Sequence, residues 1–119
     1  MIIRSAQSLP KQCRLRQADE FRAVLRNRTV FESTHLRLYI KSQMTSQECA
    51  RLGLIVAKKT ERKAVKRNRI KRLIREVFRK HRQAICGVDC VIQLKRSVES
   101  FNSSLIYQEA TTLLDKAAK

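Results

Sequence analysis

One stretch of the chain combines dense positive charge with a regular apolar pattern. It reads AVKRNRIKRLIREVFRK, residues 64–80, and Glu76 is its only acid. A guanidinium group can donate two parallel hydrogen bonds to one phosphate, and an ammonium group attracts phosphate as a compact point charge. Basic residues at this density therefore indicate phosphate binding.

The apolar residues of this stretch recur at helical spacing and divide the helix into two sides. On a wheel of about 100° per residue, one stripe faces the core; it consists of Ile70, Leu73, Ile74, Val77 and Phe78. The opposite side carries Asn68, Lys71, Arg72, Arg75 and Arg79, with Arg67 at the edge of the stripe and Arg69 on the other flank. Solvated helix faces usually mix charges of opposite sign, because like charges at i, i+4 repel. The pattern predicts a rigid cationic surface.

Basic residues are concentrated around this helix. The net charge is +17, and residues 58–82 hold 13 of the 27 Lys and Arg. Such a concentration predicts a nucleic-acid surface. A strand is expected before the helix, which disfavours a helix-turn-helix reader of DNA. The predicted RNA-binding residues are Lys58, Lys59, Lys66, Arg67, Asn68, Arg69, Lys71, Arg72, Arg75 and Arg79.

Length and composition predict one RNA-binding domain over residues 1–119, with an irregular segment at 1–13. The chain is 43% hydrophobic, enough for a packed core. No apolar run reaches the ~20 residues of a membrane span, and the N-terminus lacks the ~7–15 apolar residues of a secretory signal. A cytoplasmic protein is expected, with reduced thiols at its four cysteines; these are Cys13, Cys49, Cys86 and Cys90.

The remaining chain provides the elements that position the basic helix. Helices are predicted at 17–27, 62–81 and 102–119, and strands near 29–32, 35–42, 51–59 and 89–97, with a polar loop at 42–50 and a turn at Gly87. The order α–β–β–β–α–β–α indicates an α+β fold, a two-layer sandwich with the helices on one sheet. The strand at 51–59 is almost continuously apolar, which predicts a central position in the sheet.

Catalysis by the protein's own side chains is not indicated. His35 and His81 are the only histidines, the acids are scattered, and no glycine-rich phosphate loop is present. His81, Cys86 and Cys90 lack the paired spacing and the fourth ligand of a zinc site. We expect no catalytic residue and no metal ligand.

These motifs resemble the protein subunit of bacterial ribonuclease P. The resemblance is carried by RNRIKRLIRE, which begins at Arg67, together with RLGLIVAKK before it, EFRAVL in the first helix and GVDCVIQLKRS in the last strand. It covers about residues 14 to 114. Proteins of this family join a catalytic RNA that removes the 5′ leader from precursor tRNA, and the RNA performs the Mg²⁺-dependent chemistry. The resemblance also implies a left-handed β–α–β crossover through the basic helix, and we expect one protein per RNA.

The resemblance further implies a cleft for the 5′ leader between the first helix and the sheet. The residues that match it are Arg14, Phe21, Leu25, Arg37 and Tyr39. Aromatic rings stack on unpaired bases of any sequence, which suits a reader of many different leaders. The chain departs from the family at Leu25, where many members have Phe, and at Arg62, where many have Gly.

Two other functions are compatible with the residues alone. A general RNA-binding or ribosomal protein could use the same basic helix without any role in tRNA processing. A nuclease acting by its own side chains is the third class, and the missing catalytic constellation argues against it.

Overall fold

The computed structural model describes residues 14–15, 17–26, 29–42, 50–81, 87–98 and 103–118. Its elements are α2 (Ala18–Arg26), β1 (Thr29–Glu32), β2 (Leu36–Ser42), β3 (Arg51–Ile55), α3 (Ala64–His81), β4 (Val88–Leu94) and α4 (Ser103–Ala118). This confirms the predicted order of elements and the α+β class. The segment at 1–13, most of the loop at 42–50 and the region just after α3 lie outside the described residues.

The four strands form one mixed sheet in the order β1-β2-β4-β3. β2 pairs antiparallel with both β1 and β4, so that Leu38 lies opposite Ile92. β3 and β4 are parallel neighbours, and the chain passes between them through α3. The basic helix is therefore the crossover of a β–α–β unit.

The predicted central position of the strand at 51–59 is wrong. β3 lies at the edge of the sheet, and it ends at Ile55. Its free edge is covered locally, because Leu15 N–H donates to Leu52 O at 2.8 Å beside a bridge between Arg14 and Leu52. β4 is an interior strand with both faces largely buried. The apolar residues of β3 pack on both faces of the sheet, Leu52 and Leu54 in the larger cluster and Ile55 in the smaller one, so this edge strand is as apolar as a central strand.

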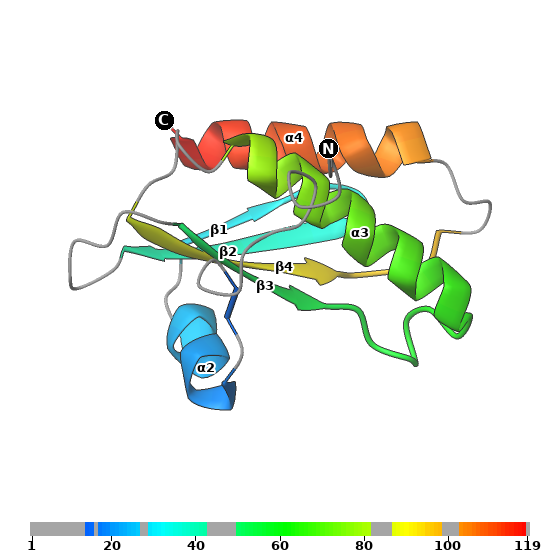
Figure 1. The fold of residues 1–119 in the computed structure, drawn as a ribbon, viewed down its shortest axis with the longest axis horizontal. Coiled ribbons are helices and arrows are strands. Elements are labelled where there is room, and N and C mark those ends of the chain that lie inside the picture. The colour runs from blue at the N-terminus through cyan, green and yellow to red at the C-terminus, as the bar shows by residue number, and fades with distance from the viewer. Residues whose placement is uncertain are drawn as a thin grey trace, which may run out of the picture.

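The helices cover both faces of the one sheet, so the molecule has three layers and not the predicted two (Figure 1). α3 and α4 pack on one face over the larger core, where Leu38 and Ile92 contact residues such as Ile74 and Leu113. α2 packs on the opposite face over a smaller cluster. α2 packs there because a small apolar patch on that face, which includes Tyr39, Ile55 and Val91, gives the apolar side of α2 a surface to cover.

Local contacts set where α3 begins. The helix starts at Ala64 rather than at residue 62, since the carbonyl of Ala57 accepts hydrogen bonds from the N–H groups of Thr60 and Glu61 in a preceding turn. No non-glycine residue has a positive φ in the described part of the chain, so Arg62 needs no glycine-like conformation. Gly87 has φ 77° and lies in a turn before β4, as predicted.

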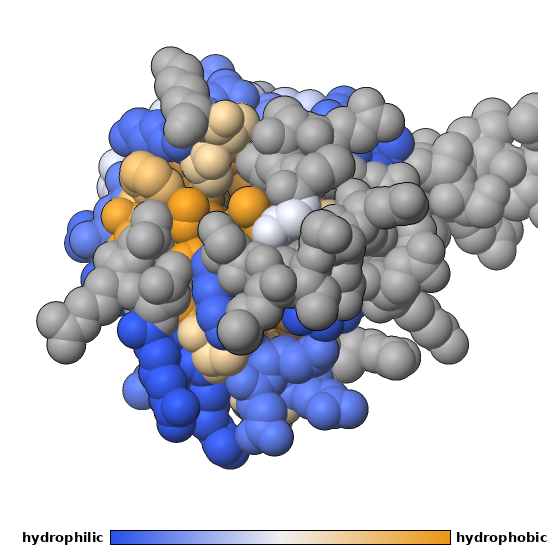
Figure 2. All heavy atoms as spheres, turned by 90° about the vertical axis from the view of Figure 1, so that its left-hand side faces the viewer, coloured by the Kyte–Doolittle hydropathy of each residue, from blue (hydrophilic) through white to orange (hydrophobic). Residues whose placement is uncertain are grey.

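One end of the molecule displays the contrast between core and surface. Figure 2 shows hydrophobic residues gathered at this end, with hydrophilic residues above them and below, where α2 lies. Within the described residues, no helix is both long and apolar enough to span a membrane.

Candidate nucleic-acid interface

The basic helix α3 is held by the side chains that the sequence pattern assigned to the core. Ile70, Ile74, Val77 and Phe78 are fully buried, and Leu73 packs against the same cluster at its margin. These contacts extend over about two and a half turns of the helix and leave α3 little freedom to rotate about its axis. Its outer side therefore has a fixed orientation relative to the sheet.

The outer side of α3 is cationic and lacks compensating acids. Asn68, Arg69 and Arg72 are exposed, whereas Lys71, Arg75 and Arg79 are half-buried. The described ion pairs of α3 involve Lys66, Glu76–Lys80 and His81. Within the described part of the chain, no carboxylate forms an ion pair with Arg69, Lys71, Arg72, Arg75 or Arg79. This surface is poised to bind a polyanion.

Two residues of the predicted RNA-binding set are engaged at the start of α3. Lys66 Nζ donates to the carbonyl of Val98 and lies 3.6 Å from Glu61 Oε1. Arg67 Nη1 donates to the carbonyls of Glu61 and Arg62, both at 3.0 Å. These contacts tie the first turn of α3 to its entry loop and to the segment after β4.

The carboxylate of Glu61 joins the entry loop of α3 to Lys66 on the helix and to Ser97 after β4. Burial alone would raise its pKa, but hydrogen bonds from the backbone of Lys63 and from Ser97, together with Lys66, hold the pKa below its ordinary value. Lys58 and Lys59 lie in the turn before the helix and are exposed. The entry to α3 thus combines an internal anchor with an exposed basic turn.

A small cavity of about 120 Å³ connects α3 with the edge of β3. It is lined by Arg14, Leu15, Phe21, Leu52, Leu54, Lys71 and Arg75. Burial, and secondarily the charge of Arg14, lowers the pKa of Arg75. Arg14 Nε is buried without a hydrogen-bond partner among the described residues. Like charges gathered around a cavity in this way favour an anion.

The predicted leader residues Phe21 and Tyr39 belong to one cluster on the α2 face. Both pack against the buried residues Leu15, Val24 and Val91. The ring of Phe21 lies directly over Gly53, where an added Cβ would be 2.6 Å from Phe21 Cε2. Leu25 points away from this core and is 36% exposed. The structure therefore brings Phe21 and Tyr39 together and leaves Leu25 on the outer surface of α2.

Arg37 is not a free cation on this face. Its Nε and Nη2 donate to Glu32 Oε1 at 3.0 and 2.9 Å, and its Nη1 donates to Tyr39 Oη at 3.3 Å. Tyr39 in turn donates to Gln93 Oε1 at 3.2 Å. Hydrogen bonds from Lys95 and from Arg37 lower the pKa of Glu32. Arg37 thus orients the tyrosine hydroxyl while a carboxylate neutralises its charge.

Sequence reasoning missed a charged cluster at the end of the same face. Arg51 of β3 donates to Glu20 of α2 and to Asp89 of β4. Its pKa is raised, chiefly by the hydrogen bonds with Asp89. No periodicity in the sequence relates Glu20 to residues on two strands far along the chain, so the pattern could not indicate this cluster.

The fold also brings together a serine, a histidine and a glutamate that sequence order did not relate. Glu109 accepts from Ser33 Oγ at 2.5 Å and from the His35 backbone N–H at 2.8 Å, and its Oε2 lies 2.7 Å from His35 Nδ1. A nucleophilic serine requires a hydrogen bond to the histidine that removes its proton. Here the serine is bonded to the carboxylate, so the cluster fastens the β1–β2 turn to α4 and has no catalytic geometry.

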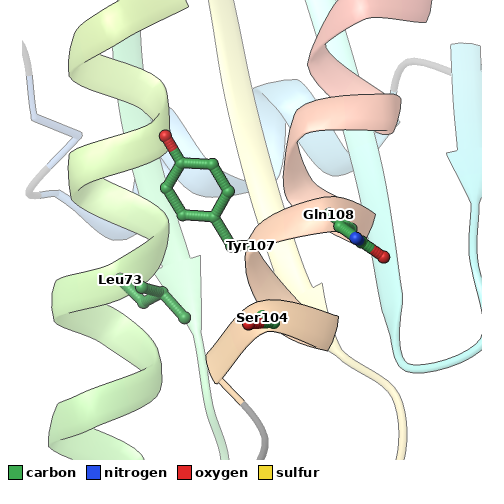
Figure 3. A pocket seen from close by; sticks show the side chains of 4 residues that line it. All are labelled: Leu73, Ser104, Tyr107 and Gln108. Atoms are coloured by element: carbon green, nitrogen blue, oxygen red, sulfur yellow. The ribbon is translucent and has the colours of Figure 1, made fainter.

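A second cavity lies between α3 and α4. It measures about 250 Å³ and is lined by Leu73, Ser104, Tyr107 and Gln108, with Leu73 and Tyr107 facing each other across it (Figure 3). Lys80 Nζ donates to Tyr107 Oη at 3.0 Å and lies 5.4 Å from the ring centroid. The basic helix and the C-terminal helix are thus joined at this groove.

The described residues contain no metal-type cluster. No group of three or more His, Cys, Asp or Glu side chains within them could hold a metal ion. Cys90 is a buried free thiol, and burial raises its pKa to about 12. Cys13, Cys49 and Cys86 lie outside the described residues.

The fold and this surface define an α+β protein with an anchored cationic helix, and known proteins share the fold. The family model for ribonuclease P matches residues 9–118. The ribonuclease P protein component of Nitrosomonas eutropha is 71% identical over 112 residues, covering 94% of this chain and 93% of that protein. That of Nitrosomonas europaea is 62% identical over 119 residues, covering 100% and 98%. The ribonuclease P protein of Staphylococcus aureus superposes with a TM-score of 0.77 at 25% identity, covering 88% of this chain and 94% of that structure.

The chain belongs to the bacterial ribonuclease P protein family, the protein component of a ribonucleoprotein endonuclease that processes tRNA. This confirms the resemblance seen in the RNRIKRLIRE motif. It also decides against a general RNA-binding or ribosomal protein that has no role in tRNA processing.

Proposed function

We propose that the protein binds the catalytic RNA of ribonuclease P through the outer side of α3 and the 5′ leader of precursor tRNA through the cleft between α2 and the sheet. The observation that carries the proposal is the row of cations on α3 that no described carboxylate pairs with. Each phosphate that such a row contacts releases counterions from the RNA, which gives strong and salt-dependent affinity. One protein binds each RNA, in the cytoplasm.

The residues divide between two roles in this proposal. The RNA-binding residues are Lys58, Lys59, Lys66, Arg67, Asn68, Arg69, Lys71, Arg72, Arg75 and Arg79. Arg69 and Arg72 are the best placed for direct phosphate contact because they are exposed. Lys66 and Arg67 contribute mainly by fixing the start of the helix, since Lys66 Nζ and Arg67 Nη1 are bonded within the chain.

The leader-binding residues are Arg14, Phe21, Leu25, Arg37 and Tyr39. The Tyr39 ring offers a stacking surface for an unpaired base, and the Arg37 hydrogen bond orients its hydroxyl. Arg14 lies at the cavity shared with Lys71 and Arg75, so a phosphate there would connect the leader with α3. Leu25 contributes apolar contact from the exposed side of α2.

The catalytic RNA performs the cleavage, and Mg²⁺ acts within the RNA. The described acids do not converge into a site that fits a protein-held ion, so we assign no protein ligand to it. The protein strengthens the affinity for leader-bearing substrate and lowers the Mg²⁺ concentration that the RNA requires. In this assignment the β3–α3–β4 crossover is left-handed, as the family resemblance implies.

Reconstitution tests the proposal. The protein is combined with ribonuclease P RNA and presented with precursor tRNA at low Mg²⁺, and binding is compared for tRNA with and without a 5′ leader. We expect cleavage only in the combined complex, and tighter binding of the leader-bearing tRNA. Cleavage by the protein alone, or equal affinity for the two tRNAs, would contradict the proposal.

A further inference from the structure

A single guanidinium group connects α2 to the two strands beneath one end of it. Arg51 Nη1 donates to Glu20 Oε2 of α2 at 2.7 Å. The same guanidinium donates to Asp89 of β4 through Nε at 2.9 Å and Nη2 at 2.7 Å. The side chains of Arg51, Glu20 and Asp89 are 23%, 29% and 10% exposed, so water reaches the cluster only in part.

Only an arginine can make this connection. A guanidinium has donors on three nitrogens in one plane, so it can bind one carboxylate with two hydrogen bonds and a second carboxylate with another. A lysine ammonium would have to meet both acids from one point. The spacing between α2 and the strands is therefore set by the rigid geometry of one side chain.

Glu20 uses its two oxygen atoms for different purposes. Oε2 accepts from Arg51, while Oε1 accepts from the backbone N–H of Gln17 at 3.1 Å. The second contact closes the first turn of α2 in the manner of a capping box, in which Glu and Gln are interchangeable. The tie to the sheet can thus be removed without removing the cap.

The hydrogen bond between Arg51 and Glu20 lies close to the position where the Phe21 ring packs on the sheet. Glu20 is next to Phe21 in the chain. The Phe21 ring lies over Gly53, which is two residues after Arg51. Residues two apart on a strand point to the same face, so Arg51 and Gly53 both face α2. α2 has nine residues and one fully buried side chain, Val24. A helix this short depends on tertiary contacts for its position.

We propose that Glu20 and Arg51 are positioning residues for leader recognition. They hold α2 at the distance from the sheet at which Phe21 and Tyr39 form one binding surface. They act through Phe21 and touch no RNA themselves. This inference rests on the proposed leader-binding function.

The sign of the expected effect separates this role from general electrostatics. Glu20→Gln makes the protein more positive, and charge alone would then strengthen RNA binding. It also replaces the oxygen that faces Arg51 with an amide, which weakens the tie to the sheet. We therefore expect Glu20→Gln to weaken the contribution of the leader while the affinity for leaderless tRNA stays equal or rises.

Asp19→Asn is the matched control. Asp19 lies in the same helical turn, its side chain is 87% exposed, and its partner is Arg22 on the same helix. The substitution changes the charge by the same amount and leaves the tie between α2 and the sheet intact. Any difference between the two variants reports the tie.

The experiment measures the dissociation constants of leader-bearing and leaderless tRNA for the complex of protein and catalytic RNA. We expect Glu20→Gln to reduce the leader preference by about 3- to 10-fold, and Asp19→Asn to leave it within about 2-fold. In a Phe21→Ala background, Glu20→Gln should cause no further loss, because the two substitutions act on the same surface. The single-turnover cleavage rate at saturating complex should be unchanged.

Four results would overturn the inference. These are an unchanged leader preference in Glu20→Gln, an equal loss for leaderless tRNA, a lowered single-turnover rate, and a loss that persists in the Phe21→Ala background. If Glu20→Gln keeps a wild-type preference, the leader-binding proposal stands and only this inference fails. If the wild-type complex itself shows no leader preference, both fail together.

Discussion

The two faces of the sheet use their charges in opposite ways. On the face covered by α3 and α4, a large apolar core anchors a helix whose outer cations have no described acidic partners. On the α2 face the core is small, and the central cations are paired, Arg37 with Glu32 and Arg51 with Glu20 and Asp89. The face covered by α3 and α4 is stabilised mainly by apolar burial, and its outer cations can bind a ligand. The α2 face is stabilised in part by the ion pairs of its own cations.

In the proposed function, this difference lets one small domain bind RNA in two modes. Unpaired cations attract any phosphate backbone, and their effect depends on salt. Paired cations contribute little net attraction, but they orient the rings and hydroxyls that, in the proposed function, touch individual nucleotides. Adding acids near α3 would weaken its attraction for RNA, whereas removing acids near α2 would loosen a binding surface.

The largest expected effect tests the anchoring of α3. Ile74 is fully buried between the helix and the sheet. Ile74→Ala should lower the free energy of unfolding by about 2–5 kcal/mol, since it leaves a cavity as well as losing apolar contact. Urea denaturation followed by circular dichroism measures the loss. A change below about 1 kcal/mol would mean that α3 is not held by this stripe.

The second prediction tests the α2 face. Tyr39→Ala should weaken binding of leader-bearing tRNA by about 1–3 kcal/mol, the usual contribution of stacking on one aromatic ring, and should affect leaderless tRNA little. Competition binding to the reconstituted complex provides both values. Tyr39→Phe is the control, because it keeps the ring and removes the hydroxyl that links Arg37 with Gln93. Equal losses for the two tRNAs would remove Tyr39 from the leader surface.

Most of the cationic surface of α3 could be predicted from the sequence. The apolar stripe and the cationic side of α3 follow from the helical period alone, and all four fully buried residues of α3 belong to the predicted stripe. A helix places its side chains by a fixed rotation per residue, so local sequence is enough. The resemblance and the element order then supplied the family and the fold class.

The α2 face, with its aromatic rings and paired cations, could be predicted only in outline. The resemblance proposed Phe21 and Tyr39 as neighbours, but the pairing of Arg51 with Glu20 and Asp89 joins three elements whose contact depends on the order of the strands. That order was predicted wrongly for β3, because helices cover both faces of this edge strand and make it as apolar as a central one. Which cations are neutralised is thus a tertiary property.

The third prediction compares one cation from each face. Arg72 is exposed on α3, and no described carboxylate pairs with it, so Arg72→Ala should reduce the slope of log affinity against log salt by about 0.7–0.9, the loss of one phosphate contact. Arg37 is already paired with Glu32, so Arg37→Ala should leave the slope nearly unchanged. Binding to catalytic RNA over a salt series measures both slopes. A comparable change in the two slopes would erase the distinction between the faces.

The smallest expected effect concerns stability at acid pH. It tests whether a buried carboxylate, Glu109, contributes more to the pH dependence of stability than a half-exposed one on the α2 face, Glu32. Burial alone would raise the pKa of Glu109, but its hydrogen bonds with Ser33 and His35 outweigh burial and hold the pKa below the ordinary value of 4.5. A carboxyl group with a depressed pKa binds fewer protons folded than unfolded, so its contribution is complete above about pH 5.5 and is lost as the pH falls below that. Glu109→Gln should therefore lower stability at pH 7 and flatten the decline on the acid side, as measured by urea denaturation at several pH values.

Glu32 also has a lowered pKa but is half-exposed, so Glu32→Gln should flatten the decline less. If Glu32→Gln flattened it more, the acid-sensitive tie would lie on the α2 face and not between α4 and the β1–β2 turn.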